Sequence, residues 1–251
     1  MEIFAAGGNA FDATVASLFA LTVVEPMMVG IFGGGTSVVH LAGGDVHVYD
    51  GLATAPASTR PDIYTPVADS WPDYMETKGR EKRVGPRAIA VPGNLIAWCE
   101  MAQEHGRLPL EQLLEPAIRH AENGFLLSSY LATCIAEIAP DLLLDPAIAA
   151  IFMPGGLPLK AGDRLVQKDY AQTLRAIAEG GPAALLQGDT GEKLRAFLND
   201  SGTWVTEEDI RNYRVIRRDP VVGTYRGHEI IGPPPPCSGG PTRFSRPLVS
   251  M

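Results

Sequence analysis

Two hydroxyl side chains beside glycines, Thr36 and Ser238, are the residues of this chain that could act as nucleophiles. A catalytic serine or threonine needs a base that removes its proton, and many serine hydrolases hold the nucleophile in a GxSxG turn. Neither residue stands in that frame, and the sequence shows no base for either of them. The pattern therefore favours a turn or strand role for both hydroxyls.

Two carboxylates, Asp12 and Glu25, lie at the two ends of one expected helix. Asn9 is of a type that caps helix N-termini, and Asp12 three residues later completes a box-like pair with it. Glu25 stands before Pro26, and a residue before proline is biased away from helical geometry. We interpret Asp12 as a cap and Glu25 as a helix-end carboxylate, with a buried acid as the alternative for Glu25.

No spacing of metal ligands is present in the sequence. The five histidines are scattered and form no HExxH pair, and no CxxC occurs. An odd number of cysteines without a pattern indicates buried or free thiols rather than a zinc site or a disulfide framework. The sequence predicts no metal. The cysteines are Cys99, Cys134 and Cys237.

A glycine cluster at residues 30–35 invites comparison with phosphate-binding loops, but it differs in detail. It lacks GK[ST], and its predicted order is helix, loop, strand. A dinucleotide fingerprint needs strand, loop, helix, so that the phosphate meets a helix N-terminus. We predict no nucleotide or other cofactor. Gly33, Gly34 and Gly35 are interpreted as positions where a strand passes close to another backbone or to a ligand.

The charge balance excludes some classes of partner. The 251 residues carry a formal net charge of −8, which argues against nucleic acid as the main partner. The one basic run, at residues 80–87, is interrupted by Glu81 and is typical of a solvated loop. No uninterrupted apolar stretch is long enough to cross a membrane. No secretory signal is visible at the N-terminus, which has Glu2 and a Gly7-Gly8 break.

The order of expected elements indicates an α+β fold, because helices and strands are segregated rather than alternating. A capped helix runs to Val24 with Phe11, Val15, Leu18, Phe19 and Thr22 on one face. Residues 65–87 are expected to form an irregular surface excursion. The expected strands are 36–41, 46–49, 213–217, 221–225 and 227–231, and the later helices 94–105, 110–123, 128–138, 146–152, 169–178 and 190–199.

Several segments, in order, resemble the γ-glutamyltranspeptidase family. Together they cover roughly residues 3–240. The chain is therefore similar to the large-subunit region of these enzymes. The segments are Gly7-Gly8-Asn9-Ala10-Phe11-Asp12-Ala13, Val24-Glu25-Pro26 with Gly30 and Gly33-Gly34-Gly35, Asp50-Gly51 with Thr54-Ala55-Pro56, Val91-Pro92-Gly93, Gly106-Arg107-Leu108-Pro109, Pro116-Ala117-Ile118, Ala121-Glu122-Asn123-Gly124-Phe125, Gly223-Thr224-Tyr225-Arg226-Gly227 and Pro234-Pro235-Pro236-Cys237-Ser238-Gly239-Gly240.

The resemblance implies an N-terminal-nucleophile hydrolase, whose αββα sandwich is built from a large and a small subunit cut from one precursor. The N-terminal threonine of the small subunit attacks the γ-glutamyl amide of glutathione-like substrates, and its own α-amine can serve as base. The implied partners are a small-molecule amide substrate and the small subunit of the same precursor. The family is often periplasmic or secreted, and the compartment of this chain stays open.

The chain departs from the family pattern at one substrate-binding position. The family places an arginine two residues before the Thr-Ala-Pro segment, where its guanidinium holds the α-carboxylate of the substrate. Leu52 occupies this position here, followed by Ala53. Leucine cannot pair with a carboxylate, so the acyl group differs, another arginine substitutes, or binding is lost.

Residues 241–251 lose the family pattern, and we expect a large-subunit-like region over residues 1–240 followed by an aberrant tail. The threonine that begins the small subunit is not expected within these residues, so no catalytic residue is assigned. Met1–Ala6 is typical of the end of a helix, which predicts preceding sequence in the parent protein. The alternatives to a γ-glutamyltranspeptidase fragment are a non-catalytic remnant and part of a related acylase with a substrate other than a γ-glutamyl compound. A lone large-subunit region should leave sheet edges uncovered and tend to associate.

Overall fold

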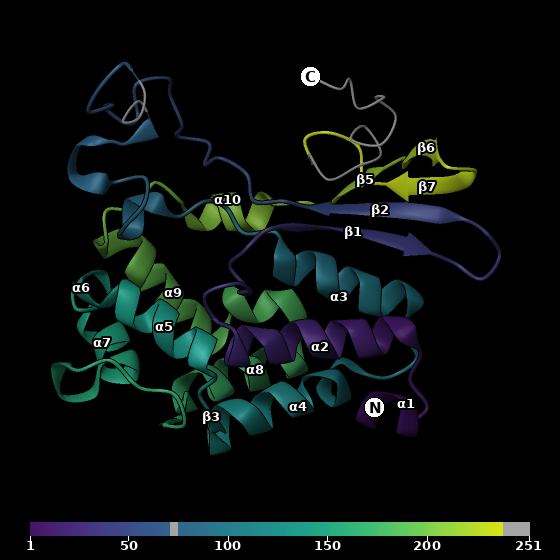
Figure 1. The fold of residues 1–251 in the computed structure, drawn as a ribbon, viewed down its shortest axis with the longest axis horizontal. Coiled ribbons are helices and arrows are strands. Elements are labelled where there is room, and N and C mark those ends of the chain that lie inside the picture. The colour runs from purple at the N-terminus through teal and green to yellow at the C-terminus, as the bar shows by residue number, and fades with distance from the viewer. Residues whose placement is uncertain (71–74, 238–251) are drawn as a thin grey trace.

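The computed structural model of the chain describes residues 1–70 and 75–237 and combines helices with small antiparallel sheets (Figure 1). The helices are α1 (Glu2–Ala5), α2 (Ala10–Val24), α3 (Asn94–His105), α4 (Leu110–Asn123), α5 (Ser129–Glu137), α6 (Ala139–Leu142), α7 (Pro146–Phe152), α8 (Lys168–Gly180), α9 (Gly188–Asp200) and α10 (Glu207–Asn212). The strands are β1 (Gly35–His40), β2 (Val46–Gly51), β3 (Phe125–Leu126), β4 (Arg164–Leu165), β5 (Ile216–Arg218), β6 (Val221–Tyr225) and β7 (His228–Gly232).

Helix α2 begins as the sequence predicts. The side chain of Asn9 accepts hydrogen bonds from the backbone of the first turn, and the Asp12 side chain accepts from the Asn9 N–H, so the capping box is complete. The buried stripe contains Val15, Phe19 and Thr22 as expected. Phe11 and Leu18 pack only partly against the core. Residues 12, 16 and 23 join the buried stripe instead.

The core lies among four helices, α2, α3, α4 and α8. Helix α4 packs on both α2 and α8, and α3 packs on α2. Phe19 meets Trp98 edge to face, with 5.4 Å between ring centroids, and this geometry suits the quadrupoles of aromatic rings. Leu113 and Leu174 are fully buried in the same cluster. Apolar burial in this layer therefore supports the sheet that lies on it.

The main sheet has the strand order β1-β2-β5, and both pairings are antiparallel. Thr36 faces Asp50 across the first pair, and Val48 faces Arg218 across the second. Helix α3 covers one side of this sheet, and Figure 1 shows the β6–β7 hairpin above the other side. The hairpin forms a two-stranded sheet of its own among the described residues.

A second cluster lies beside the main core, where α5, α6 and α7 pack around the short β3–β4 pair. The Ser128 hydroxyl caps α5, and the Asp145 carboxylate accepts from two backbone N–H groups at the start of α7. Several apolar side chains of this region are exposed, including Leu144 at 70%. The two-residue strands β3 and β4, and helix α6, were not expected from the sequence.

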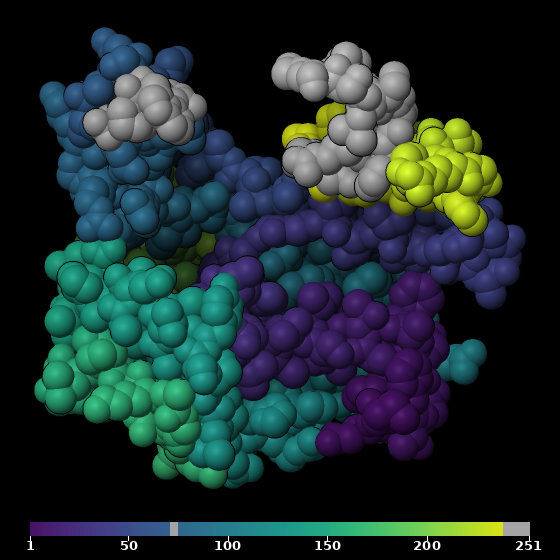
Figure 2. Space-filling view, viewed as in Figure 1, coloured from purple at the N-terminus to yellow at the C-terminus, as the bar shows by residue number. Residues whose placement is uncertain are grey.

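Residues 55–70 and 75–90 form an irregular excursion that is longer than the 65–87 predicted from the sequence. Its base is closed by an antiparallel bridge between Thr54 and Val91, whose backbones exchange hydrogen bonds of 3.0 and 2.9 Å. Arg80 ties the excursion to Asp141 of α6 by two hydrogen bonds. Figure 2 shows the described part of the excursion, in blue, rising on the same side of the molecule as the β6–β7 hairpin. The base of the excursion lies directly after Leu52.

Candidate functional site

Leu52 follows the last residue of β2, and side chains rather than a strand hold its backbone. The Leu52 N–H donates to Oδ1 of Asp50 at 3.1 Å, and its carbonyl oxygen accepts from the Tyr213 hydroxyl at 2.8 Å. The Leu52 side chain is half-buried. Residue 52 therefore has a fixed backbone at the point where the sheet ends and the excursion begins.

Asp50 is tied to a second element of the sheet. Its side chain is 6% exposed, and its Oδ2 accepts from Nε of Arg218 on β5 at 2.6 Å. A buried carboxylate is stable only when it is paired and hydrogen-bonded, and Asp50 meets both conditions. One carboxylate thus joins Leu52 to strand β5.

The glycines of the 33–35 cluster lie against this segment. A Cβ atom added to Gly34 would lie 2.1 Å from the backbone nitrogen of Ala53, closer than any side chain can approach. Gly33 accepts backbone hydrogen bonds from Gly93 and Asn94 at the start of α3. Gly33 and Gly34 therefore allow close packing of the backbone, which is the role that their sequence pattern predicts.

A hollow of about 460 Å³ lies just after Leu52 in the chain, between residues 54–57 and helix α10. Its lining includes Glu208 and Asp209 of α10 and the ring of Tyr213. Asp209 also accepts a hydrogen bond from the Ala57 N–H at 2.8 Å, which fixes the start of the excursion. No lysine, arginine or histidine is among the lining residues of this hollow. Its charged groups therefore favour a cationic or neutral group over a carboxylate.

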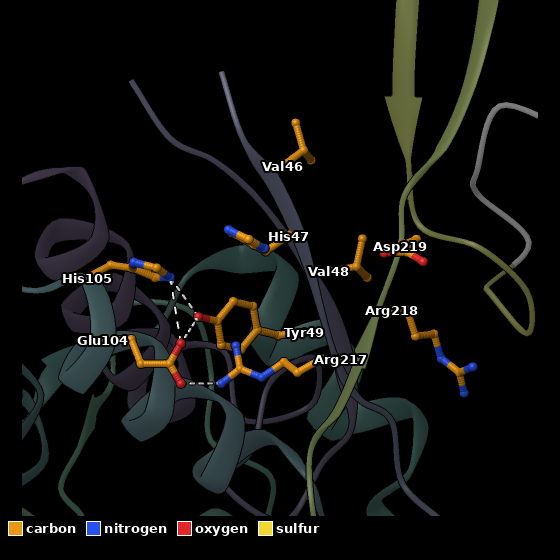
Figure 3. Close-up of a pocket in the computed structure, with 9 residues that line it drawn as sticks. All are labelled: Val46, His47, Val48, Tyr49, Glu104, His105, Arg217, Arg218 and Asp219. Carbon is orange, nitrogen blue, oxygen red and sulfur yellow. Dashed lines mark hydrogen bonds and ion pairs between the residues drawn. The ribbon is translucent and has the colours of Figure 1, made fainter. Parts of the chain in front are cut away.

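A second hollow of about 430 Å³ lies at the other end of β2 (Figure 3). The Tyr49 hydroxyl donates to Glu104 at 2.6 Å, and it also meets Nε2 of His105 at 2.6 Å. Arg217 lies over the Tyr49 ring, 3.5 Å from its centroid, and bonds to Glu104. Arg218 points away from these groups in Figure 3, because successive strand residues alternate between faces.

Three polar groups of this second hollow, those of Tyr49, Glu104 and Arg217, bind one another. Burial, followed by the hydrogen bond to Glu104, raises the pKa of Tyr49 to about 12, so the phenol is a neutral donor at ordinary pH. Burial opposes ionisation of Glu104, but its bonds with Tyr49 and Arg217 outweigh it and lower its pKa. The cluster joins β2, β5 and α3, and its chemistry fits a structural network better than proton transfer.

Glu104→Gln should therefore lower stability near neutral pH by about 1 kcal/mol or less, the size usual for partly exposed ion pairs. Because the folded pKa of Glu104 is lowered, its contribution is complete above the unfolded value of 4.5 and is lost as pH falls through the folded value. Urea unfolding at about pH 7 and about pH 3 measures this difference, which should shrink in acid. Glu100→Gln is the control, because Glu100 bonds to Arg217 but not to Tyr49.

Among the described residues, Thr36, Asp12 and Glu25, which the sequence singled out for chemistry, share no hydrogen bond with one another. Thr36 lies on β1, and its hydroxyl is buried without a hydrogen-bond partner in the described part of the chain. Ser238 lies outside the described residues. Glu25 ends α2 as expected, but its Oε2 is buried and unpaired there. Tyr213 belongs to no motif and was expected only as the start of a strand, while Asp50 was visible only as part of the Asp50-Gly51 motif.

Within residues 1–70 and 75–237, no group of three or more histidine, cysteine or acidic side chains could hold a metal ion. In the same residues, no helix is both long and apolar enough to cross a membrane.

Comparison with known proteins decides the family. The sequence profile of one family, Gamma-glutamyltranspeptidase, matches residues 1–244. This chain belongs to the γ-glutamyltranspeptidase family. It is similar to the crystal structure of Helicobacter pylori γ-glutamyltranspeptidase with a TM-score of 0.87 and 35% identity, over 95% of this chain and 67% of that one. The fold is thus part of the family's N-terminal-nucleophile hydrolase fold, as the motifs implied.

Two curated relatives differ in what their names say they act on. An acylase proenzyme, ACY 1 of Pseudomonas sp. (strain V22), is 50% identical over 239 residues, which are 95% of this chain and 43% of the acylase. The glutathione hydrolase proenzyme of Bacillus subtilis (strain 168) is 38% identical over 242 residues, 95% of this chain and 40% of that protein. The γ-glutamyltranspeptidase-family chain thus spans less than half the length of these relatives.

Proposed function

We propose that this chain supplies the large-subunit part of an enzyme that cleaves amide bonds through a threonine acyl-enzyme, and that its acyl substrate need not carry the α-carboxylate of a γ-glutamyl group. The observation that carries the second clause is Leu52. It stands where the family's carboxylate-binding arginine is expected, at the fixed end of β2.

The surroundings of Leu52 support this substrate class. A half-buried leucine offers an apolar surface and no donor, so a carboxylate placed there would lose water without gaining a partner. The neighbouring hollow adds two carboxylates, Glu208 and Asp209, and no cationic side chain. An amine or an uncharged group on the acyl chain is therefore better matched than a carboxylate. The relatives, named as an acylase and as glutathione hydrolases, leave the acyl group open.

A complementation assay tests the proposal. The purified chain is combined with the part of the Pseudomonas acylase proenzyme that it does not match, and hydrolysis of two anilides is followed. These are γ-glutamyl-p-nitroanilide and γ-aminobutyryl-p-nitroanilide, which differ only by the α-carboxylate. The expected result is turnover by the pair and none by either part, with kcat/KM for the aminobutyryl compound at least equal to that for the γ-glutamyl compound.

The matched control is the same pair with the N-terminal threonine of the small subunit replaced by alanine, which should abolish turnover. A preference of about a hundredfold or more for the γ-glutamyl compound would show that Leu52 does not set the acyl specificity. A stable complex without turnover would instead support the non-catalytic remnant.

A further inference from the structure

The backbone of Leu52 is held on both sides by side chains. Strand β2 ends at Gly51, so residue 52 has left the ladder of the sheet. Its N–H bonds instead to Asp50 and its carbonyl oxygen to Tyr213, so each of the two peptide units that meet at residue 52 is held. These two bonds fix two consecutive peptide planes and thus the direction of the Cα–Cβ bond of residue 52.

Both partners are themselves fixed. Asp50 is 5% exposed and bonded to Arg218, and Tyr213 is 7% exposed and packed in a cluster with Val91 and Ile210. Burial, followed by the charge of Asp50, raises the pKa of Tyr213 to about 12, so the phenol stays protonated and keeps its donor. Neither side chain can turn away from Leu52 without leaving a buried polar group unpaired, which is unfavourable.

The backbone at Gly93 packs closely against the Tyr213 hydroxyl and the end of β2. A Cβ atom at Gly93 would lie 2.2 Å from the Tyr213 hydroxyl and 2.2 Å from the Gly51 carbonyl oxygen. Glycine at the start of α3 is therefore required for the phenol to reach Leu52. Strand β2, helix α3 and the segment after α10 meet at this residue.

We propose that Asp50 and Tyr213 are positioning residues that hold the backbone of Leu52 so that the side chain of residue 52 faces the substrate in one orientation. Arg218 keeps the Asp50 carboxylate in place. The importance of residue 52 rests on the proposed function, but its positioning is a property of this chain and is measured without catalysis.

The test uses the isotope-labelled 251-residue chain and two signals, the hydrogen exchange of the Leu52 amide and the methyl resonances of Leu52. Tyr213→Phe removes only the hydroxyl. The expected result is exchange at residue 52 faster by about tenfold and shifted, averaged Leu52 methyl signals, with exchange in α4 and α8 unchanged. Tyr64→Phe is the control, because the Tyr64 hydroxyl also donates to a carbonyl oxygen, that of Arg87, within the excursion.

A second pair of variants separates positioning from general stability. Asp50→Asn places an amide N–H₂ against the Nε–H of Arg218, two donors face to face, and should loosen Leu52 at least as much as Tyr213→Phe. Adding Arg218→Gln supplies an acceptor for that amide and should restore the Leu52 signals. Rescue by a complementary side chain is expected of a positioning contact and not of nonspecific destabilisation.

Unchanged Leu52 signals in Tyr213→Phe would overturn the proposal, as would an equal acceleration of exchange at Leu52 and in α4 and α8. If the Asp50→Asn variant does not fold, the Leu52 signals of Tyr213→Phe alone test the proposal. Because neither signal depends on turnover, such a result would leave the proposed amide hydrolysis standing, and a failed complementation assay would leave the positioning standing.

Discussion

Replacing Asp12 by alanine is expected to lower the free energy of unfolding by about 3–5 kcal/mol. Asp12 is 0% exposed, and its carboxylate accepts from the backbone N–H groups of Asn9, Arg107 and Leu108 at 2.7 to 3.3 Å. Alanine leaves these donors without an acceptor at the junction of α2 with the turn between α3 and α4. For a domain of this size, thermal melting should show a Tm lower by about 10 °C.

The matched control for Asp12→Ala is Asp145→Ala. The Asp145 carboxylate also accepts from two backbone N–H groups at a helix start, those of Ala147 and Ile148, but it is exposed. Water replaces its bonds, so the loss should be about 1 kcal/mol. Equal losses in the two variants would mean that the buried bonds to residues 107 and 108 contribute nothing beyond an ordinary helix cap.

Leu52→Arg is expected to change the substrate preference of the complemented enzyme by about 10- to 100-fold in favour of γ-glutamyl-p-nitroanilide over γ-aminobutyryl-p-nitroanilide. A guanidinium at residue 52 can form two charge-assisted hydrogen bonds with the α-carboxylate, and such bonds contribute about 1.5–3 kcal/mol. The ratio of kcat/KM for the two anilides measures the change, because the compounds differ only in that carboxylate.

Leu52→Met is the control for this substitution, since it keeps an apolar, uncharged side chain of similar volume and should leave the ratio near that of the natural sequence. If arginine and methionine give the same ratio, residue 52 does not face the acyl group, and the assignment carried by the family motif is wrong. The Leu52→Arg variant should retain the hydrogen bonds of the Leu52 backbone, which do not involve the side chain.

Local patterns in the sequence predicted local structure well. The Asn9–Asp12 box was readable because its partners are three residues apart, and α2 begins there as predicted. The bonds from Asp12 to residues 107 and 108 join segments about 95 positions apart, and no spacing reveals them. A buried role for Asp12 beyond capping therefore became visible only in the fold.

Tertiary contacts also explain where the expected strands shifted. The sequence predicted a strand over residues 213–217, whereas β5 covers Ile216–Arg218. Tyr213 has strand-like character, but its ring packs against Val91 and Ile210 and its hydroxyl reaches Leu52, which removes it from the ladder. Competition from side-chain packing overrides local strand preference at such positions.

The candidate site was only half readable from the sequence. The Asp50-Gly51 and Thr54-Ala55-Pro56 motif located Leu52, and the resemblance supplied the reason to examine it. Tyr213 lies 161 positions away from Leu52 and belongs to no motif, so its hydrogen bond depends on the whole fold. The histidines at 47 and 105, scattered in the sequence, stack beside Tyr49 for the same reason.

The central claim is that this chain is the large-subunit part of a two-part amide-cleaving enzyme. Its most direct test mixes the chain with the unmatched part of the Pseudomonas acylase and measures the molar mass of the species formed by light scattering. The predicted result is a one-to-one complex, with the chain alone self-associating through its uncovered sheet edges. Two separate species, with the chain alone a monodisperse monomer that melts cooperatively, would contradict it.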